Sequence, residues 1–207
     1  MNPHWLNHHA TRVLYDRLAG WYDFLAGTSE QHVRQRGIDI LGIRAGEKVL
    51  ELGCGTGLAL AGLGKQAKQA VGVDLSLKML QAAQRKGICH LVQADFLLLP
   101  YPSESFEAAF LCFSLETLPE GETQAALQEI QRVLKENGRI CLVNIARVPA
   151  RGAIPRLYLA AHQRFPHVVD CRPLDASAEL VKAGYTILRE DLSRVWSIPV
   201  EIVMAVK

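Results

Sequence analysis

Apolar positions along this chain follow two different spacings, and the change between them outlines the fold. From about residue 47, short apolar runs bounded by glycine, asparagine or aspartate alternate with stretches in which apolar residues recur at helical spacing. The predicted strands cover residues 47–52, 69–74, 89–94, 106–112, 138–145, 185–191 and 199–207. The helices predicted between them cover residues 57–66, 76–86, 122–135 and 174–183.

This alternation predicts an α/β domain with a doubly wound, mostly parallel sheet of seven strands, because strand–helix–strand units place parallel strands side by side. The short link at residues 193–198 favours an antiparallel hairpin of the last two strands at the sheet edge. Before the sheet, residues 2–27 have helical spacing, and Thr28-Ser29 is expected to cap a second helix over residues 30–41. Residues 149–173 mix helix and loop signals.

Composition and charge indicate which partners and which cellular compartment to expect for the protein. A formal net charge of +2 argues against nucleic acid as a partner. The 5 cysteines are odd in number and lack the pair spacing of a metal site, and no signal peptide is evident, so a reducing cytoplasm is expected. No apolar run reaches the length of about 18 residues that a bilayer-spanning helix needs, which leaves only peripheral membrane attachment open.

The segment VLELGCGTG, residues 49–57, carries the strongest chemical signal. A short apolar strand leads into glycines at alternate positions, Gly53, Gly55 and Gly57. Alternating glycines let the backbone turn tightly and let a ligand approach without meeting a Cβ atom. Glu51 argues against a bound phosphate, because a phosphate loop needs positive potential and exposed N–H groups. The segment therefore favours a ligand with cationic groups or hydroxyls.

Acidic residues also follow the next two predicted strands. Asp74 ends the strand 69–74, where an α/β site places a carboxylate for the two hydroxyls of a ribose. Asp95 and Phe96 follow the strand 89–94, and they offer an acceptor for an exocyclic amine and a ring for stacking. Together with the glycine turn, these residues predict a nucleoside pocket without a phosphate clamp.

Four segments in this order and spacing resemble the class I S-adenosylmethionine-dependent methyltransferases, in particular the group of quinone-ring and phospholipid methyltransferases. The segments are VLELGCGTG (49–57), VGVDLSLKML (71–80), VQADFLLLPYPSESFEAAF (92–110) and VLKENGRICLVNI (133–145). In the last one Asn137-Gly138 stands where the family usually has Pro-Gly-Gly, and it suits the same turn. The resemblance implies a Rossmann-like methyltransferase fold, methyltransferase activity and S-adenosyl-L-methionine as cofactor.

The resemblance also implies which residues contact the cofactor. Glu51 and the glycine turn would face its methionine and ribose, Asp74 would hold the ribose hydroxyls, and Asp95 would accept from the adenine amine. Tyr22 would close over the methionine end. The full expected set is Tyr22, Glu51, Gly53, Cys54, Gly55, Gly57, Asp74, Leu75, Met79, Asp95, Phe96 and Cys112.

The chain is expected to form one methyltransferase domain with four segments. Residues 1–42 form a helical cap, residues 43–146 the cofactor-binding core, residues 147–173 an acceptor lid region, and residues 174–207 a C-terminal helix with the edge hairpin. Methyl transfer from a sulfonium depends mainly on position, orientation and a dry site, so the absence of an acid–base pair would not contradict this expectation.

The sequence leaves the catalytic residues unassigned. The candidates are Glu116 in the loop after the fourth strand, Tyr22, and His162 in the lid region. Each has a plainer interpretation: an exposed loop acid, a packing residue of the first helix, or an ordinary lid histidine. Tyr15, in a second Tyr-Asp dipeptide, is interpreted as a packing residue.

Histidines near the start of the chain raise the question of a metal. His4, His8 and His9 could share a helix face, but they lack an acidic partner or a fourth ligand nearby, so we expect a frayed terminus and predict no metal. The aromatic N-terminal helix with Arg12 and Arg17 is expected to cover the cofactor cleft; as an alternative, it rests on a membrane surface.

The methyl acceptor is expected to be a small molecule or a lipid. The leading candidate is the amine of phosphatidylethanolamine, with C- or O-methylation of a quinone or another soluble metabolite as the alternative. A non-catalytic module with the same fold is a third hypothesis, although three retained carboxylates speak against it. A nicotinamide-dependent dehydrogenase is disfavoured by Glu51 and by Leu58, which stands where the last glycine of the dinucleotide turn would fall.

Overall fold

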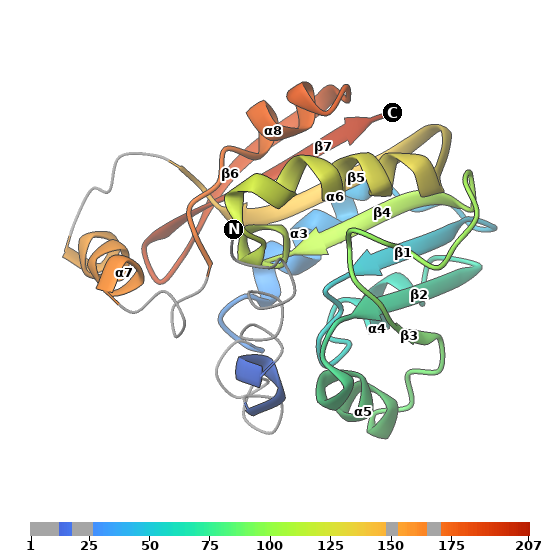
Figure 1. Ribbon diagram of the computed structural model, residues 1–207, viewed down its shortest axis with the longest axis horizontal. Helices are drawn as coiled ribbons and strands as arrows, with labels where there is room; N and C mark the ends of the chain where they lie inside the picture. The colour runs from blue at the N-terminus through green and yellow to red at the C-terminus, as the bar shows by residue number, and fades with distance from the viewer. Residues whose placement is uncertain (1–12, 18–26, 148–152, 165–170) are drawn as a thin grey trace.

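The protein forms a single seven-stranded sheet with helices on both faces (Figure 1). The computed structural model describes residues 13–17, 27–147, 153–164 and 171–207. The strands are β1 (Lys48–Leu52), β2 (Gln69–Asp74), β3 (Leu91–Gln93), β4 (Phe106–Cys112), β5 (Leu134–Ile145), β6 (Thr186–Val195) and β7 (Ile198–Val206). Their order in the sheet is β3-β2-β1-β4-β5-β7-β6, and β7 runs antiparallel to both of its neighbours. The predicted doubly wound, mostly parallel sheet is therefore confirmed.

The strand order places the ligand site. The chain builds outward from β1 through β2 to β3, then returns to the other side of β1 with β4 and continues to β5. The direction of winding thus reverses between β1 and β4, whose register pairs Leu52 with Leu111 near their carboxyl ends. In open α/β sheets, ligands bind beyond the carboxyl ends of the strands at such a reversal.

The helices lie on both faces of the sheet and at its carboxyl edge. They are α3 (Gln31–Leu41), α4 (Leu60–Leu63), α5 (Leu77–Arg85), α6 (Thr123–Val133), α7 (Ala153–Arg164) and α8 (Ala176–Lys182), with 3₁₀ turns η1 (Leu115–Thr117) and η2 (Glu120–Glu122). One buried apolar cluster joins the sheet to α6 and α8, and a second joins the opposite face to α3 and α4. In the part of the chain that the structure describes, no helix is long and apolar enough to cross a bilayer.

Several element boundaries differ from the sequence prediction. The helix predicted over residues 57–66 is only the single turn of α4, because the glycine turn before it and Gly64 after it leave little room for a longer helix. Thr28-Ser29 does not cap α3; its N-cap is Glu30, without a side-chain hydrogen bond. The predicted six-residue link between the last strands is also wrong, since β6 and β7 extend until only Trp196 and Ser197 remain between them.

The N-terminal helix predicted over residues 2–27 is described in part. Residues 13–17 are helical and Gly27 lies in a turn, and the remainder lies outside the described residues, together with Tyr22, the histidine cluster and Arg12. Residues 153–164 supply the helical part of the mixed region, α7, which Figure 1 places beside the tip of the β6–β7 hairpin. The four-segment division of the chain stays a prediction.

Candidate functional site

The glycine turn after β1 bends the chain sharply across the carboxyl end of β2. Gly53 and Cys54 both donate their backbone N–H groups to the carbonyl oxygen of Val73, at 2.8 and 3.0 Å. Gly53 and Gly55 adopt positive φ values of 70° and 52°, a region that glycine enters without steric cost. The turn therefore carries the backbone from the end of β1 to the tip of β2, as the VLELGCGTG segment predicted.

Two glycines of this turn serve different purposes. A Cβ atom at Gly53 would lie 2.4 Å from Cβ of Ser114, so this position is closed by the loop after β4. A Cβ atom at Gly55 would meet nothing within 4 Å, because the residue faces the open cleft. Gly57 lines no part of the cleft and packs against Ile88 instead. Of the three glycines, Gly55 offers the bare backbone that a ligand could approach.

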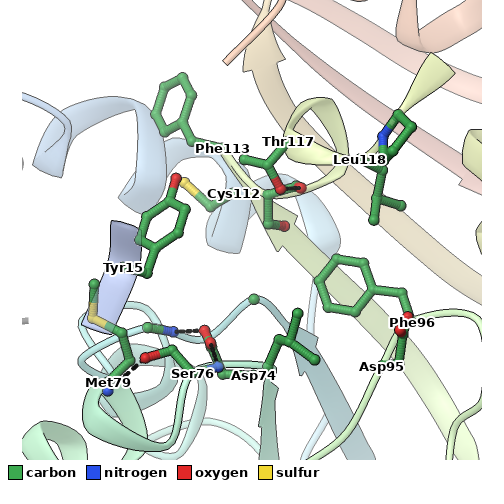
Figure 2. A pocket seen from close by; sticks show the side chains of 15 residues that line it. Tyr15, Asp74, Ser76, Met79, Asp95, Phe96, Cys112, Phe113, Thr117 and Leu118 are labelled. Atoms are coloured by element: carbon green, nitrogen blue, oxygen red, sulfur yellow. Dashed lines mark hydrogen bonds between the residues drawn. The ribbon is translucent and has the colours of Figure 1, made fainter. Parts of the chain in front are cut away.

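Asp74 at the tip of β2 is held rigidly toward the cleft. Its two carboxylate oxygens accept hydrogen bonds from the backbone N–H groups of Gly55 and Ser76, both at 2.8 Å (Figure 2). Burial raises the pKa of the Asp74 carboxyl, while these backbone bonds oppose the increase. The backbone of the glycine turn thus helps to fix Asp74, the acid predicted to hold a ribose. Each carboxylate oxygen of Asp74 keeps a lone pair for a further donor.

Ser76 links this acid to the N-terminal helix. Its hydroxyl accepts from the backbone N–H of Met79 and so caps α5, and it donates to Asp16 over 2.6 Å. Asp16 lies in the short helical piece at residues 13–17, and its neighbour Tyr15 lines the cleft. The interpretation of Tyr15 as a simple packing residue is therefore corrected: Tyr15 is a wall of the site.

The tip of β3 supplies the far end of the cleft. Asp95 and Phe96 both line it, and Oδ1 of Asp95 accepts a hydrogen bond from the backbone N–H of Leu97 at 3.0 Å. Phe96 is almost fully buried, and Figure 2 shows its ring on the same side as Asp95, facing across the cleft toward Leu118. A carboxylate and a ring edge at one end of the cleft suit a flat heteroaromatic ligand.

The resulting cleft encloses about 740 Å³ of empty space, including its open mouth. Asp74, Ser76 and Met79 form one wall, with Leu75 beside them, and Tyr15, Cys112 and Phe113 face them from the opposite wall (Figure 2). The remaining lining residues are Gly53, Gly55, Asp95, Phe96, Ser114, Thr117, Leu118 and Pro119. One wall carries the polar side chains of Asp74 and Ser76, and the other is mainly apolar.

A second, smaller hollow of about 320 Å³ shares Gly53, Gly55 and Cys112 with the main cleft. Its charged residues are Glu51 at the end of β1, Glu30 before α3, and Arg34 of α3. Arg34 donates to the carbonyl oxygen of Gly27 at 2.8 Å and approaches Glu30 at 3.8 Å. When both acids are ionised, two carboxylates beside one arginine give this hollow a net negative charge.

Burial makes these acids expensive to ionise in the absence of a cation. It raises the pKa of Glu51 well above its ordinary value, an increase that Arg34 opposes and Asp74 reinforces. Burial likewise raises the pKa of Glu30 to about 7, against the effect of Arg34. The Oε2 atom of Glu51 is buried and has no hydrogen-bond partner among the described residues. A ligand with an N–H⁺ group would satisfy both the missing hydrogen bond and the charge.

The cysteines of the site behave as apolar groups. Cys112 lines both hollows, and Cys54 lines the smaller one and packs against the backbone of β2. Burial raises the pKa of both thiols far above the ordinary value, so neither is a thiolate at neutral pH. Within the described ranges, no group of three or more acidic, histidine or cysteine residues could hold a metal ion.

The predicted catalytic candidates do not gather in the cleft. Glu116, expected in an exposed loop, lies in η1 and is 1% exposed; its Oε1 accepts from the backbone N–H of Ile145 at 3.4 Å. The described part of α7 includes His162, which lines neither hollow. Tyr22 lies outside the described residues.

The sequence predicts the loop after the fourth strand, residues 113–120, as a wall of the acceptor site, but it does not specify which of its side chains line the cleft opposite Asp74. Phe113, Ser114, Thr117, Leu118 and Pro119 follow β4 and turn over the cleft through η1. Phe113 has a φ of 52°, which is unusual for a bulky side chain. The signals available were the position of this segment after a central strand and its mixture of apolar and hydroxyl residues, and these indicate a loop without specifying which side chains face inward.

Comparisons with known proteins match the part of the chain that contains the glycine turn and the acids at the strand ends. Residues 50–142 match the family model described as a methyltransferase domain, which spans the glycine turn through β5. The chain is 39% identical over 118 residues to the demethylmenaquinone methyltransferase of Corynebacterium kroppenstedtii, covering 56% of this chain and 50% of that protein. It is 32% identical over 162 residues to the protein of the same name from Tropheryma whipplei, covering 72% and 64%.

A third relative is the ubiquinone/menaquinone biosynthesis C-methyltransferase of Syntrophotalea carbinolica, which is 33% identical over 160 residues, covering 72% of this chain and 66% of that protein. The chain thus spans between half and two thirds of the length of these curated relatives.

Solved structures resemble the fold over nearly the whole chain. A chain from the complex between the Haloferax volcanii Trm112 methyltransferase activator and a methyltransferase superposes with a TM-score of 0.76 at 17% identity, covering 93% of this chain and 96% of that chain. A SAM-dependent methyltransferase from Thermotoga maritima gives 0.74 at 18% identity, covering 94% and 98%. Magnesium protoporphyrin IX methyltransferase from Synechocystis, solved with bound SAH, gives 0.67 at 18% identity, covering 86% and 84%. At these identities the likeness establishes the fold.

Proposed function

The chain belongs to the class I S-adenosylmethionine-dependent methyltransferases, and on that premise we propose that it transfers a methyl group from S-adenosyl-L-methionine to a ring carbon of a quinol-type acceptor. The observation that carries the cofactor assignment is the set of acids around the glycine turn. Glu51 is buried and Asp74 is half-buried, and the hollows that they line meet at Gly53 and Gly55. Such a site repels phosphates and attracts a sulfonium and an ammonium group.

The two hollows fit different parts of this cofactor. Asp74 would accept from the ribose hydroxyls, and Asp95 with Phe96 would hold the adenine at the far end of the main cleft. In the smaller hollow, Oε2 of Glu51 would accept from the methionine ammonium group, and Arg34 would pair with the carboxylate. When bound, the cofactor supplies a methyl group activated by a positively charged sulfur; the residues of this chain supply position, counter-charge and exclusion of water.

The apolar wall supports the choice of acceptor. Tyr15, Phe113, Leu118 and Pro119 give this wall aromatic and aliphatic surface, which suits a flat, apolar ring better than a zwitterionic lipid headgroup. The relatives from Tropheryma whipplei and Syntrophotalea carbinolica, which cover most of the domain, are named for quinone methylation. Their names favour the quinone alternative over phosphatidylethanolamine, the leading candidate from the sequence.

Transfer to a ring carbon forms a carbon–carbon bond as the sulfur–carbon bond breaks, and the ring then loses its proton. A base must accept that proton. Among the predicted catalytic residues, Glu116 is the candidate whose neighbours in the sequence, Ser114 and Thr117, both line the cleft. Its role stays a prediction, as do those of Tyr22 and His162.

Two measurements, made one after the other, test the proposal. Calorimetry with S-adenosyl-L-methionine comes first: binding separates a cofactor-using enzyme from a non-catalytic module of the same fold. The protein is then incubated with methyl-labelled cofactor and either reduced demethylmenaquinone or phosphatidylethanolamine vesicles. We expect label in the quinol product and none in the lipid. Label confined to the lipid would restore the amine as acceptor, and binding without any labelled quinol would end the quinol assignment.

A further inference from the structure

The sheet ends on one side in a long edge strand, β6 (Figure 1). The opposite edge, β3, has only 3 residues, and a short edge strand is one way in which proteins avoid pairing with other sheets. In contrast, β6 has 10 residues and contains neither lysine nor proline, the residues that commonly protect an edge. We propose that β6 pairs antiparallel with β6 of a second copy of this chain, so that two sheets join across a twofold axis.

The outer edge of β6 presents backbone groups in the pattern that a further antiparallel strand needs. A turn of two residues joins β6 to β7, and the residues that flank such a turn are hydrogen-bonded to each other. Because bonded and non-bonded positions alternate, the N–H and C=O groups of Glu190, Leu192 and Arg194 face outward. The position of His32 agrees with this direction, since its ring contacts the carbonyl oxygen of Arg194 at 3.0 Å.

The side chains of these three residues lie on one face of the sheet, because strand residues at alternate positions share a face. Glu190 accepts a hydrogen bond from Ser177 of α8 at 2.6 Å, so this is the face that α8 covers. Leu192 is 66% exposed, and the charged residues on either side of it, Glu190 and Arg194, are exposed as well. Val181, one helical turn after Ser177, is 59% exposed and adds apolar surface beside this edge.

The charges along β6 are self-complementary in one register. An irregularity between Ile187 and Arg189 leaves residues 189–195 as the regular part of the strand, and Leu192 is its centre. A twofold axis at Leu192 pairs this whole stretch with itself and places Leu192 opposite Leu192 of the second copy. It also places Glu190 opposite Arg194 of the second copy, twice by symmetry. Opposite charges and apolar side chains in facing positions both stabilise a pair of strands.

The other registers that keep the outward backbone groups facing each other lose this match. A shift of two residues places Asp191 opposite Asp191 of the second copy in one direction, and in the other it leaves Glu190 beyond the paired stretch. A shift of four residues places Glu190 opposite Glu190, or Arg194 opposite Arg194. Like charges in facing positions destabilise strand pairing. The charge pattern therefore selects one register, and it identifies a second copy of this chain as the partner of the edge.

Sedimentation velocity of the full chain over a range of concentrations tests the proposal. We expect an equilibrium between monomer and dimer. Glu190→Arg and Arg194→Glu each create two pairs of like charges, and each alone should weaken dimerisation about tenfold. The variant that carries both changes restores opposite charges in reversed order and should recover the dimer. Glu104→Arg makes the same change of charge on an exposed loop residue before β4, and as the control it should leave the dimer unchanged.

A backbone variant tests the ladder independently of charge. Leu192→Pro removes the N–H group that faces outward, and it leaves the hydrogen bonds between β6 and β7 intact, so the protein should stay folded as a monomer. A parent that is monomeric at every concentration, a dimer that neither single charge variant weakens, or no recovery in the double variant would each overturn the proposal. The inference does not depend on the quinol assignment. Glu190, Leu192 and Arg194 line neither hollow, so calorimetry should show unchanged binding of S-adenosyl-L-methionine in every variant.

Discussion

The two walls of the cleft are built in different ways. The wall at the ends of β1 and β2 carries the polar groups, and hydrogen bonds connect its residues. The backbone N–H groups of Gly55 and Ser76 both donate to the carboxylate of Asp74. The opposite wall is mainly apolar, and it combines residues 13–17, far away in sequence, with the segment after β4. The first wall is specified by local sequence, and the second only by the assembled fold.

This difference corresponds to the two tasks of the site. The polar wall must hold one fixed set of chemical groups, so its acids are positioned by backbone N–H groups that do not vary with the side chains around them. The apolar wall must fit one particular acceptor and exclude water, and packing side chains from several segments achieves this. The acids of the polar side are costly without a ligand, because burial raises the pKa values of Glu51 and Asp74.

The largest expected effect comes from closing the space where the walls meet. Gly53→Ala would place a Cβ atom 2.4 Å from Cβ of Ser114 at a φ of 70°, so we expect a loss of about 3–4 kcal/mol in the free energy of unfolding. Gly55→Ala has a similar φ but no neighbour within 4 Å, and it should cost only about 1 kcal/mol while still impairing cofactor binding. Urea unfolding measures both, and equal losses would contradict the assigned difference between these glycines.

Next in size is the pH dependence that the acidic hollow imposes on stability. Burial raises the pKa of Glu30 from 4.5 to about 7, so the folded state holds this proton more tightly than the unfolded state does. Its stabilising contribution is complete below pH 4.5 and is lost as the pH rises through about 7. Glu30→Gln should match the parent at pH 4 and exceed it by about 3 kcal/mol at pH 8. Urea unfolding at both pH values gives the test; a difference independent of pH would show that Glu30 is not the titrating group.

A smaller effect is expected from the acid that the turn positions. Asp74→Ala should weaken binding of S-adenosyl-L-methionine by about 1–3 kcal/mol, because hydrogen bonds to a charged acceptor are lost. Asp39→Ala removes an acid that accepts a hydrogen bond from Gln35 on the surface of α3 and lines neither hollow, and it serves as the control. Calorimetry on the two variants decides the matter, since an unchanged dissociation constant for Asp74→Ala would remove Asp74 from the cofactor site.

The same division explains how much the sequence could reveal. The strands, their order along the chain and the acids at their tips follow from patterns a few residues long, so Glu51, Asp74, Asp95 and Phe96 were placed where the structure has them lining a hollow. Gly57 was grouped with the other glycines because the motif does not reveal that its neighbour in space is Ile88.

Tyr15 shows where the prediction failed. Two Tyr-Asp dipeptides lie seven residues apart, and the sequence offered no way to tell which one reaches the cleft. The choice depends on the hydrogen bond between Asp16 and Ser76, 60 residues away. The exposed state expected for Glu116 was wrong for a similar reason, because its burial comes from η1 folding against the end of β5. Contacts between distant segments decide such details, and no local pattern encodes them.

The smallest expected effects compare the two walls directly through one ring on each side. Phe113→Ala removes an aromatic side chain from the apolar wall and should raise KM for the acceptor about tenfold, roughly 1.4 kcal/mol, with cofactor binding unchanged. Phe96→Leu should do the reverse, weakening cofactor binding by about 1 kcal/mol through lost stacking and leaving the acceptor KM as it is. Steady-state kinetics with each substrate varied in turn separates the two. If both variants changed both constants alike, the walls would not divide cofactor from acceptor, since a single mixed surface would then bind both.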